Sequence, residues 1–125
     1  MFSVVDPIRQ FMSNGEVCTL KSAFLAASVA NNQSVVAAVA GKRIRVMGLN
    51  WQTASGAGAG TMQFKSNSGG SALTPAFQVP LQPTIDRWPI STTGYFETAT
   101  GHGLFVDVAT QAVTVMVFYI EYTPI

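Results

Sequence analysis

The chain reads Val113-Thr114-Val115-Met116-Val117-Phe118-Tyr119-Ile120-Glu121-Tyr122 near its C-terminus. Branched and aromatic side chains fit a pleated, half-buried surface, so this composition predicts a strand. One face of that strand carries valines and a tyrosine, and the other face carries Met116, Phe118, Ile120 and Tyr122. A strand that is apolar on both faces lies at the centre of a layered core or is covered by a neighbouring subunit. We therefore expect an oligomer interface among Val115, Val117, Phe118, Tyr119, Ile120 and Tyr122.

A second strand is predicted over residues 42–53, where Ile44 and Val46 alternate with basic residues. Beyond Gly48 the apolar positions shift by one residue, which is the change of phase that a β-bulge produces. Residues 55–60 alternate glycine with serine and alanine, so we expect a flexible hairpin loop there. Residues 61–66 then form the returning strand.

The remaining pattern divides into short strands and turns. Strands are predicted over 19–27, 34–40, 77–79 and 104–109, with turns at Asn31-Asn32 and over 67–71. Prolines between 75 and 89 favour edge strands, because proline has no N–H to donate to a ladder. Residues 1–17 are expected to form an irregular arm or a short helix, and residues 18–125 a single domain. About seven or eight short strands predict an all-β fold, an antiparallel, jelly-roll-like β-sandwich.

The composition excludes several classes of protein. Charged residues make up 10% of the chain, against about 25% in ordinary soluble domains. Hydrophobic residues are 48% and the net charge is +1, which argues against disorder and against nucleic acid as a main partner. The longest stretch of small and apolar residues, 23–40, is interrupted by Asn31-Asn32-Gln33, so we expect no membrane span. A small chain with so little charge is expected to associate with other copies or partners.

Catalytic and metal-binding constellations are scarce. His102 is the only histidine and Cys18 the only cysteine, so one chain cannot build a multi-His or multi-Cys site. We expect no enzyme activity, no metal and no cofactor, and Cys18 is expected to be a small buried hydrophobe. Gly56, Gly58 and Gly60 lack the helix and lysine of a phosphate-binding loop. A hydrolase built on His102 and Asp107 is the minor alternative, because no nucleophile-elbow motif accompanies them.

Two groups of residues are candidate partner contacts. The only basic cluster, Lys42, Arg43 and Arg45, is expected to form a solvated edge or an intersubunit ion pair, with an anionic partner as the alternative. Trp51 and Trp88 are the second group, and with Tyr95 they could stack on a sugar. Core packing and subunit contacts use the same residue types, so both interpretations remain open at this point.

Four segments, taken in order, resemble a small β-sandwich module of tailed-bacteriophage virion proteins. They are 35–46, ending Gly41-Lys42-Arg43-Ile44-Arg45-Val46; 60–66, reading Gly60-Thr61-Met62-Gln63-Phe64-Lys65-Ser66; 94–104, beginning Gly94-Tyr95-Phe96-Glu97-Thr98; and Phe118-Tyr119-Ile120-Glu121-Tyr122. Such modules look like capsid decoration (cement) proteins, head fibres or tail-associated proteins, and they usually trimerise. Residues 1–17 lie outside the resemblance.

The resemblance implies a non-enzymatic virion structural protein. We expect a trimeric decoration protein on the outer capsid surface, made in the host cytoplasm, that contacts copies of itself and the major capsid protein and stabilises the head shell. The alternative is a head-fibre or tail-associated adhesin that binds a host-surface glycan through Trp88, Trp51 or Tyr95.

Overall fold

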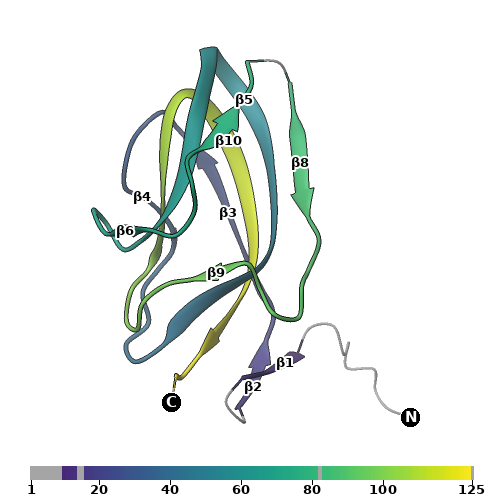
Figure 1. The fold of residues 1–125 in the computed structure, drawn as a ribbon, viewed down its shortest axis with the longest axis vertical. Coiled ribbons are helices and arrows are strands. Elements are labelled where there is room, and N and C mark those ends of the chain that lie inside the picture. The colour runs from purple at the N-terminus through teal and green to yellow at the C-terminus, as the bar shows by residue number, and fades with distance from the viewer. Residues whose placement is uncertain (1–9, 14–15, 82, 125) are drawn as a thin grey trace.

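The computed structural model describes residues 10–13, 16–81 and 83–124, and the strands in this part of the chain all pair antiparallel (Figure 1). The strands are β1 Gln10–Ser13, β2 Glu16–Thr19, β3 Lys21–Ala27, β4 Gln33–Val36, β5 Arg43–Ser66, β6 Ser71–Ala72, β7 Phe77–Val79, β8 Ile85–Trp88, β9 Phe96–Glu97 and β10 Leu104–Tyr122. No helix occurs among these residues, and none of them forms a segment that could cross a membrane as a helix. The prediction of an all-β, antiparallel sandwich-like fold is confirmed.

Two long strands, β5 and β10, run side by side and arch together over the top of the molecule (Figure 1). The first half of β5 pairs with the second half of β10, and β3, β8 and β9 flank these halves. The other halves of β5 and β10 pair with each other, and β4, β6 and β7 flank them. One curled sheet therefore provides both layers of the sandwich.

The prediction of a hairpin loop over residues 55–60 is wrong, because β5 continues through these residues to Ser66. A side chain at Gly60 would collide with the carbonyl oxygen of Ala109, so glycine lets the two backbones pass closely at the bend. On β10 the register shifts on either side of Gln111, and Thr110 has a φ of 70°. The predicted strands 104–109 and 113–122 are consequently parts of one bent strand.

The predicted bulge at Gly48 is confirmed. Phe118 pairs with Gly48 while Tyr119 pairs with Val46, so Met47 is the extra residue. The extra residue places Met47 on the face opposite Val46 and Leu49. The two faces of β10 contact different clusters. Val113, Val115, Val117 and Tyr119 pack in or against the main core, whereas Ile120 and Tyr122 on the other face pack with Met47 and Cys18 in a second cluster. The predicted burial of Cys18 is also confirmed, since 4% of it is exposed.

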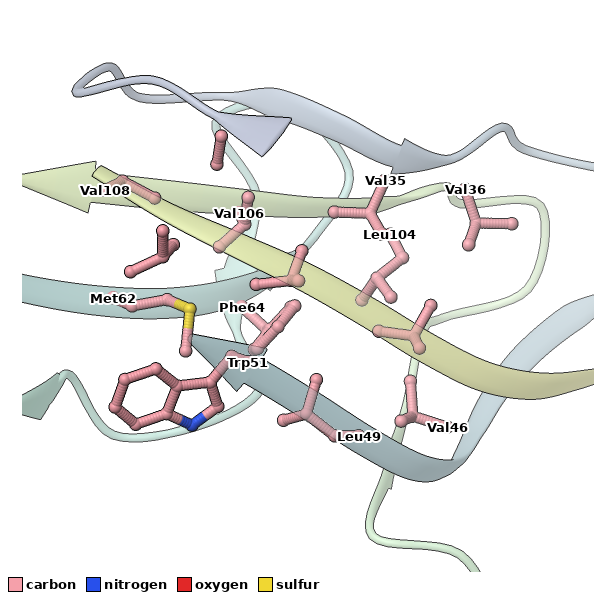
Figure 2. Close-up of a cluster of buried hydrophobic side chains, with 14 of the residues drawn as sticks. Val35, Val36, Val46, Leu49, Trp51, Met62, Phe64, Leu104, Val106 and Val108 are labelled. Atoms are coloured by element: carbon pink, nitrogen blue, oxygen red, sulfur yellow. The ribbon is translucent and has the colours of Figure 1, made fainter. Parts of the chain in front are cut away.

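The main core lies between the two layers and is made mostly by β5 and β10 (Figure 2). Phe64 is fully buried, and its ring centroid lies 5.3 Å from that of Phe96. Trp51 is only 6% exposed and belongs to this core. Trp51 therefore serves in core packing and does not present its ring for stacking on a sugar.

The boundaries of the shorter strands agree less well with those predicted from the sequence. The turn at Asn32, with a φ of 57°, and the edge strand β7 agree with the predictions. The predicted strand 34–40 is confined to β4, and 19–27 is divided between β2 and β3. The N-terminal arm is extended at Gln10–Ser13, where β1 pairs with β2 in a separate two-stranded sheet. The rest of the predicted arm or helix lies mostly outside the described residues, and the expected boundary at 17/18 falls within β2.

Candidate functional site

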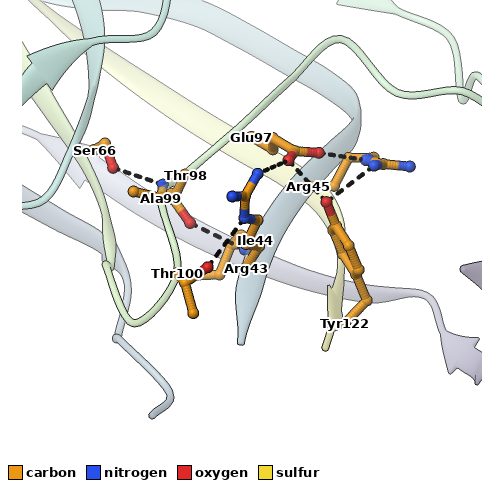
Figure 3. A network of polar contacts seen from close by, with 9 residues as sticks. All are labelled: Arg43, Ile44, Arg45, Ser66, Glu97, Thr98, Ala99, Thr100 and Tyr122. Carbon is orange, nitrogen blue, oxygen red and sulfur yellow. Dashed lines mark hydrogen bonds and ion pairs between the residues drawn. The ribbon is translucent and has the colours of Figure 1, made fainter. Parts of the chain in front are cut away.

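The basic cluster at the start of β5 is held by a carboxylate of the same chain (Figure 3). Arg43 Nη1 and Arg45 Nε each donate to the Glu97 carboxylate at 2.8 Å. The Tyr122 hydroxyl donates to Glu97 at 2.7 Å and accepts from Arg45 at 3.0 Å. The Arg45 guanidinium also lies over the Tyr122 ring, 4.6 Å from its centroid. The expected intersubunit ion pair is thus an intrachain one for Arg43 and Arg45, while Lys42 occupies the turn that precedes β5.

The network changes the acidity of its carboxylate. Burial alone would raise the pKa of Glu97, but hydrogen bonds from Arg43, Tyr122 and Arg45 together outweigh it and hold the pKa below its usual value. The pKa of Asp107 is lowered in the same way. Burial alone would raise it, but hydrogen bonds from Lys65 and from the backbone N–H of Asn32 outweigh the effect of burial. The folded structure therefore favours the ionised form of both carboxyl groups.

We expect the free energy of unfolding to fall as pH drops below about 4.5, because both carboxyl groups have lower pKa values folded than unfolded. Each carboxylate contributes to the free energy of unfolding at pH values above its pKa in the unfolded chain. This contribution is lost as pH falls through the pKa of the same group in the folded protein. Glu97→Gln should flatten this dependence, which urea unfolding between pH 3 and 7 would measure. Asp107→Asn is the matched second variant and should flatten it independently. Parallel profiles for Glu97→Gln and the unmodified protein would contradict the assignment.

The minor hydrolase hypothesis paired His102 with Asp107, and the structure does not bring them together. Asp107 pairs with Lys65 at 2.8 Å and accepts a hydrogen bond from the Asn32 backbone at 2.7 Å. His102 Nδ1 instead lies 2.9 Å from the Ser66 hydroxyl, which also accepts from the backbone N–H of Ala99. Only 3% of Ser66 is exposed, so the contact holds the turn before β10 against the end of β5 rather than presenting a nucleophile.

No group of three metal-ligating side chains occurs in the part of the chain that the structure describes.

Trp88, Pro89 and Tyr95 form an aromatic shelf beside edge strand β8, the strand at the right of Figure 1. The Trp88 and Tyr95 ring centroids are 5.1 Å apart, and Phe77 meets Trp88 edge-on at 5.3 Å. With Arg87 they line an open hollow of about 390 Å³. Of the three predicted sugar-stacking residues, the structure brings two together and places Trp51 in the core.

A second surface covers the outside of the sheet formed by β3, β10, β5 and β8. Met116 pairs directly with Phe24 on one side and with Asn50 on the other, and Asn50 pairs with Arg87. The next row contains Thr114, Gln52 and Ile85. We call these seven residues the outer face; with Trp51 they line a shallow hollow. Phe24 and Ile85 are each 63% exposed, and Met116 is 36% exposed.

The predicted oligomer-interface residues need correction. Val115, Val117, Ile120 and Tyr122 are buried within the chain itself, between 0% and 4% exposed, so they do not face a partner. Phe118 and Tyr119 are half-buried. Both faces of β10 are covered within the chain. The main core covers Val115 and Val117, and the cluster that includes Cys18 of β2 covers Ile120 and Tyr122. The exposed large apolar residue of this strand is Met116. Phe24, which pairs with it, and Ile85, two strands away on β8, were not predicted.

Comparisons with known proteins give no family assignment. No protein-family model matches the sequence, and no curated protein matches it either. The functional proposal therefore depends on the two surfaces described above.

Proposed function

We propose that this protein is a non-enzymatic structural protein of a tailed-bacteriophage virion, a trimeric decoration protein of the capsid. The observation that carries the proposal is the outer face, where Phe24, Met116 and Ile85 are exposed on a rigid sheet. Phe24 and Met116 are direct neighbours, and Ile85 lies beyond Asn50 and Gln52 of β5. Exposed apolar residues gathered on one face mark interaction surfaces in soluble proteins. The resemblance of the sequence to tailed-bacteriophage virion proteins indicates the kind of partner, which is the major capsid protein.

The distribution of charge supports association. Seven basic and six acidic residues are all that the chain contains. Four ion pairs inside the described part of the chain already use many of them: Lys21–Glu121, Arg43–Glu97, Arg45–Glu97 and Lys65–Asp107. Arg87 is the charged residue of the outer face. Little electrostatic repulsion therefore opposes contact between this face and another protein surface.

A decoration protein of this kind acts mechanically. It bridges neighbouring capsid subunits, so expansion or internal pressure must break additional contacts before the shell separates. A contact of about 800 Å² per partner is the standard size for a stable interface. Each contact can be modest, because many attachment points on one particle act together.

Cryo-electron microscopy of purified virions tests the proposal. We expect density matching this fold on the outer shell, at points where capsid subunits meet. Light scattering of the purified protein should give about three times the 13.3 kDa chain mass. A shell without this chain would contradict the virion role, and a monomer at micromolar concentration would contradict the trimer.

A further inference from the structure

The two rings of the aromatic shelf are fixed by hydrogen bonds within the chain. The Trp88 indole N–H donates to Asp86 at 3.2 Å, and the Tyr95 hydroxyl donates to the Pro89 carbonyl at 2.6 Å. Phe77 supports Trp88 edge-on, with 88° between the ring planes. A ligand that stacks here would not have to immobilise these side chains, so less entropy is lost on binding. The polar atoms of both rings are therefore already used. Trp88 is half-buried against the main core, and Tyr95 is the more exposed ring.

A cation without an internal partner stands beside the rings. Arg87 is exposed on β8, and its guanidinium makes no ion pair with any residue that the structure describes. The adjacent carboxylate, Asp86, accepts hydrogen bonds from the Arg87 backbone N–H and from Trp88. A guanidinium presents a fork of N–H donors that fits a carboxylate in two parallel hydrogen bonds. Arg43 and Arg45 contrast with it, because Glu97 already occupies them.

The hollow is a broad, open depression of about 390 Å³ that four residues line. Trp88, Pro89 and Tyr95 supply the apolar surface, and Arg87 supplies the polar group that would orient a ligand. The face of an aromatic ring is electronegative and attracts the C–H bonds that project from a sugar ring.

We infer that the shelf binds a carboxylate-bearing saccharide, with sugar rings stacked on Trp88 and Tyr95 and the carboxylate paired with Arg87. The inference goes beyond the proposed shell-binding role and does not require it, since Arg87 is the only described residue that lines both the shelf hollow and the hollow of the outer face. A proline-rich peptide is the competing occupant, because aromatic grooves also bind polyproline helices. The unpaired Arg87 favours the acidic sugar.

A glycan array and calorimetry test the inference with the full chain. The array should contain neutral, uronate-bearing and sialylated glycans, and we expect binding to carboxylate-bearing members. Calorimetry should then compare a uronic-acid tetrasaccharide with its neutral counterpart and with a decaproline peptide. Trp88→Ala or Tyr95→Ala should weaken uronate binding about tenfold or more. Arg87→Gln should reduce the affinity for the uronate to that for the neutral sugar.

Controls separate this site from the outer face and from unfolding. Tyr95 is 41% exposed, so Tyr95→Ala should keep the thermal transition of the unmodified protein. Phe24→Ala alters the outer face without adding a charge to the hollow that Phe24 shares with Arg87. It should leave the affinity for the tetrasaccharide unchanged, whatever it does to shell binding. The inference is overturned if no carboxylate-bearing glycan binds, if Arg87→Gln retains full uronate affinity, or if only the peptide binds.

Discussion

Replacing Phe64 with alanine is expected to lower the free energy of unfolding by about 3–5 kcal/mol. The side chain is fully buried on β5, and its ring lies against Phe96 from edge strand β9. Truncation removes buried apolar area and leaves a cavity that the surrounding strands can close only in part. Domains of this size are stable by about 5–15 kcal/mol. Urea unfolding followed by tryptophan fluorescence would measure the loss.

Leu81→Ala is the control for this prediction. Leu81 is also a large apolar residue, but it is 54% exposed. Surface substitutions usually change stability by about 0.5 kcal/mol or less. Equal losses in the two variants would contradict the position of Phe64 at the centre of the core.

The sequence contains clear signals for the local features of the fold. The change of apolar phase at Gly48 is enough to place the bulge, because the period of a strand is two residues and an extra residue inverts it. Asn32 tolerates the left-handed conformation that its turn requires. The prolines on either side of Phe77–Val79 similarly indicate the edge strand β7.

The course of β5 could not be predicted in the same way. Alternating glycine and small residues suit both a flexible loop and a strand that bends sharply from one layer to the other. The two differ only through a tertiary contact, the close approach of Gly60 to the backbone of Ala109. Residues 49 positions apart in the sequence make this contact, and no local pattern reports it.

The charge network illustrates the same limit. Arg43 and Arg45 form a recognisable basic cluster, but their partners come from β9 and from the last residue of β10. Arg45 and Glu97 are 52 residues apart in the sequence, so no local pattern predicts that they pair. The burial of Ile120 is equally non-local, because Cys18 and Leu20, from the first part of the chain, pack against its face of β10.

Introducing one carboxylate into the outer face is expected to weaken shell binding about 100-fold or more. In Phe24→Asp or Met116→Asp, an interface that buries the apolar pair would also have to bury an unpaired charge. Both side chains are partly exposed in the free protein, so the fold should tolerate either change. Cosedimentation with shells stripped of this protein would measure the binding.

Val29→Asp is the matched control, because Val29 is 51% exposed and lies in the turn after β3, away from the outer face. It adds the same charge to the same chain, so a general effect of net charge would appear in this variant too. Weakening by Phe24→Asp and Met116→Asp but not by Val29→Asp would locate the contact on β3 and β10. Equal binding by all three variants would exclude the outer face as the shell contact.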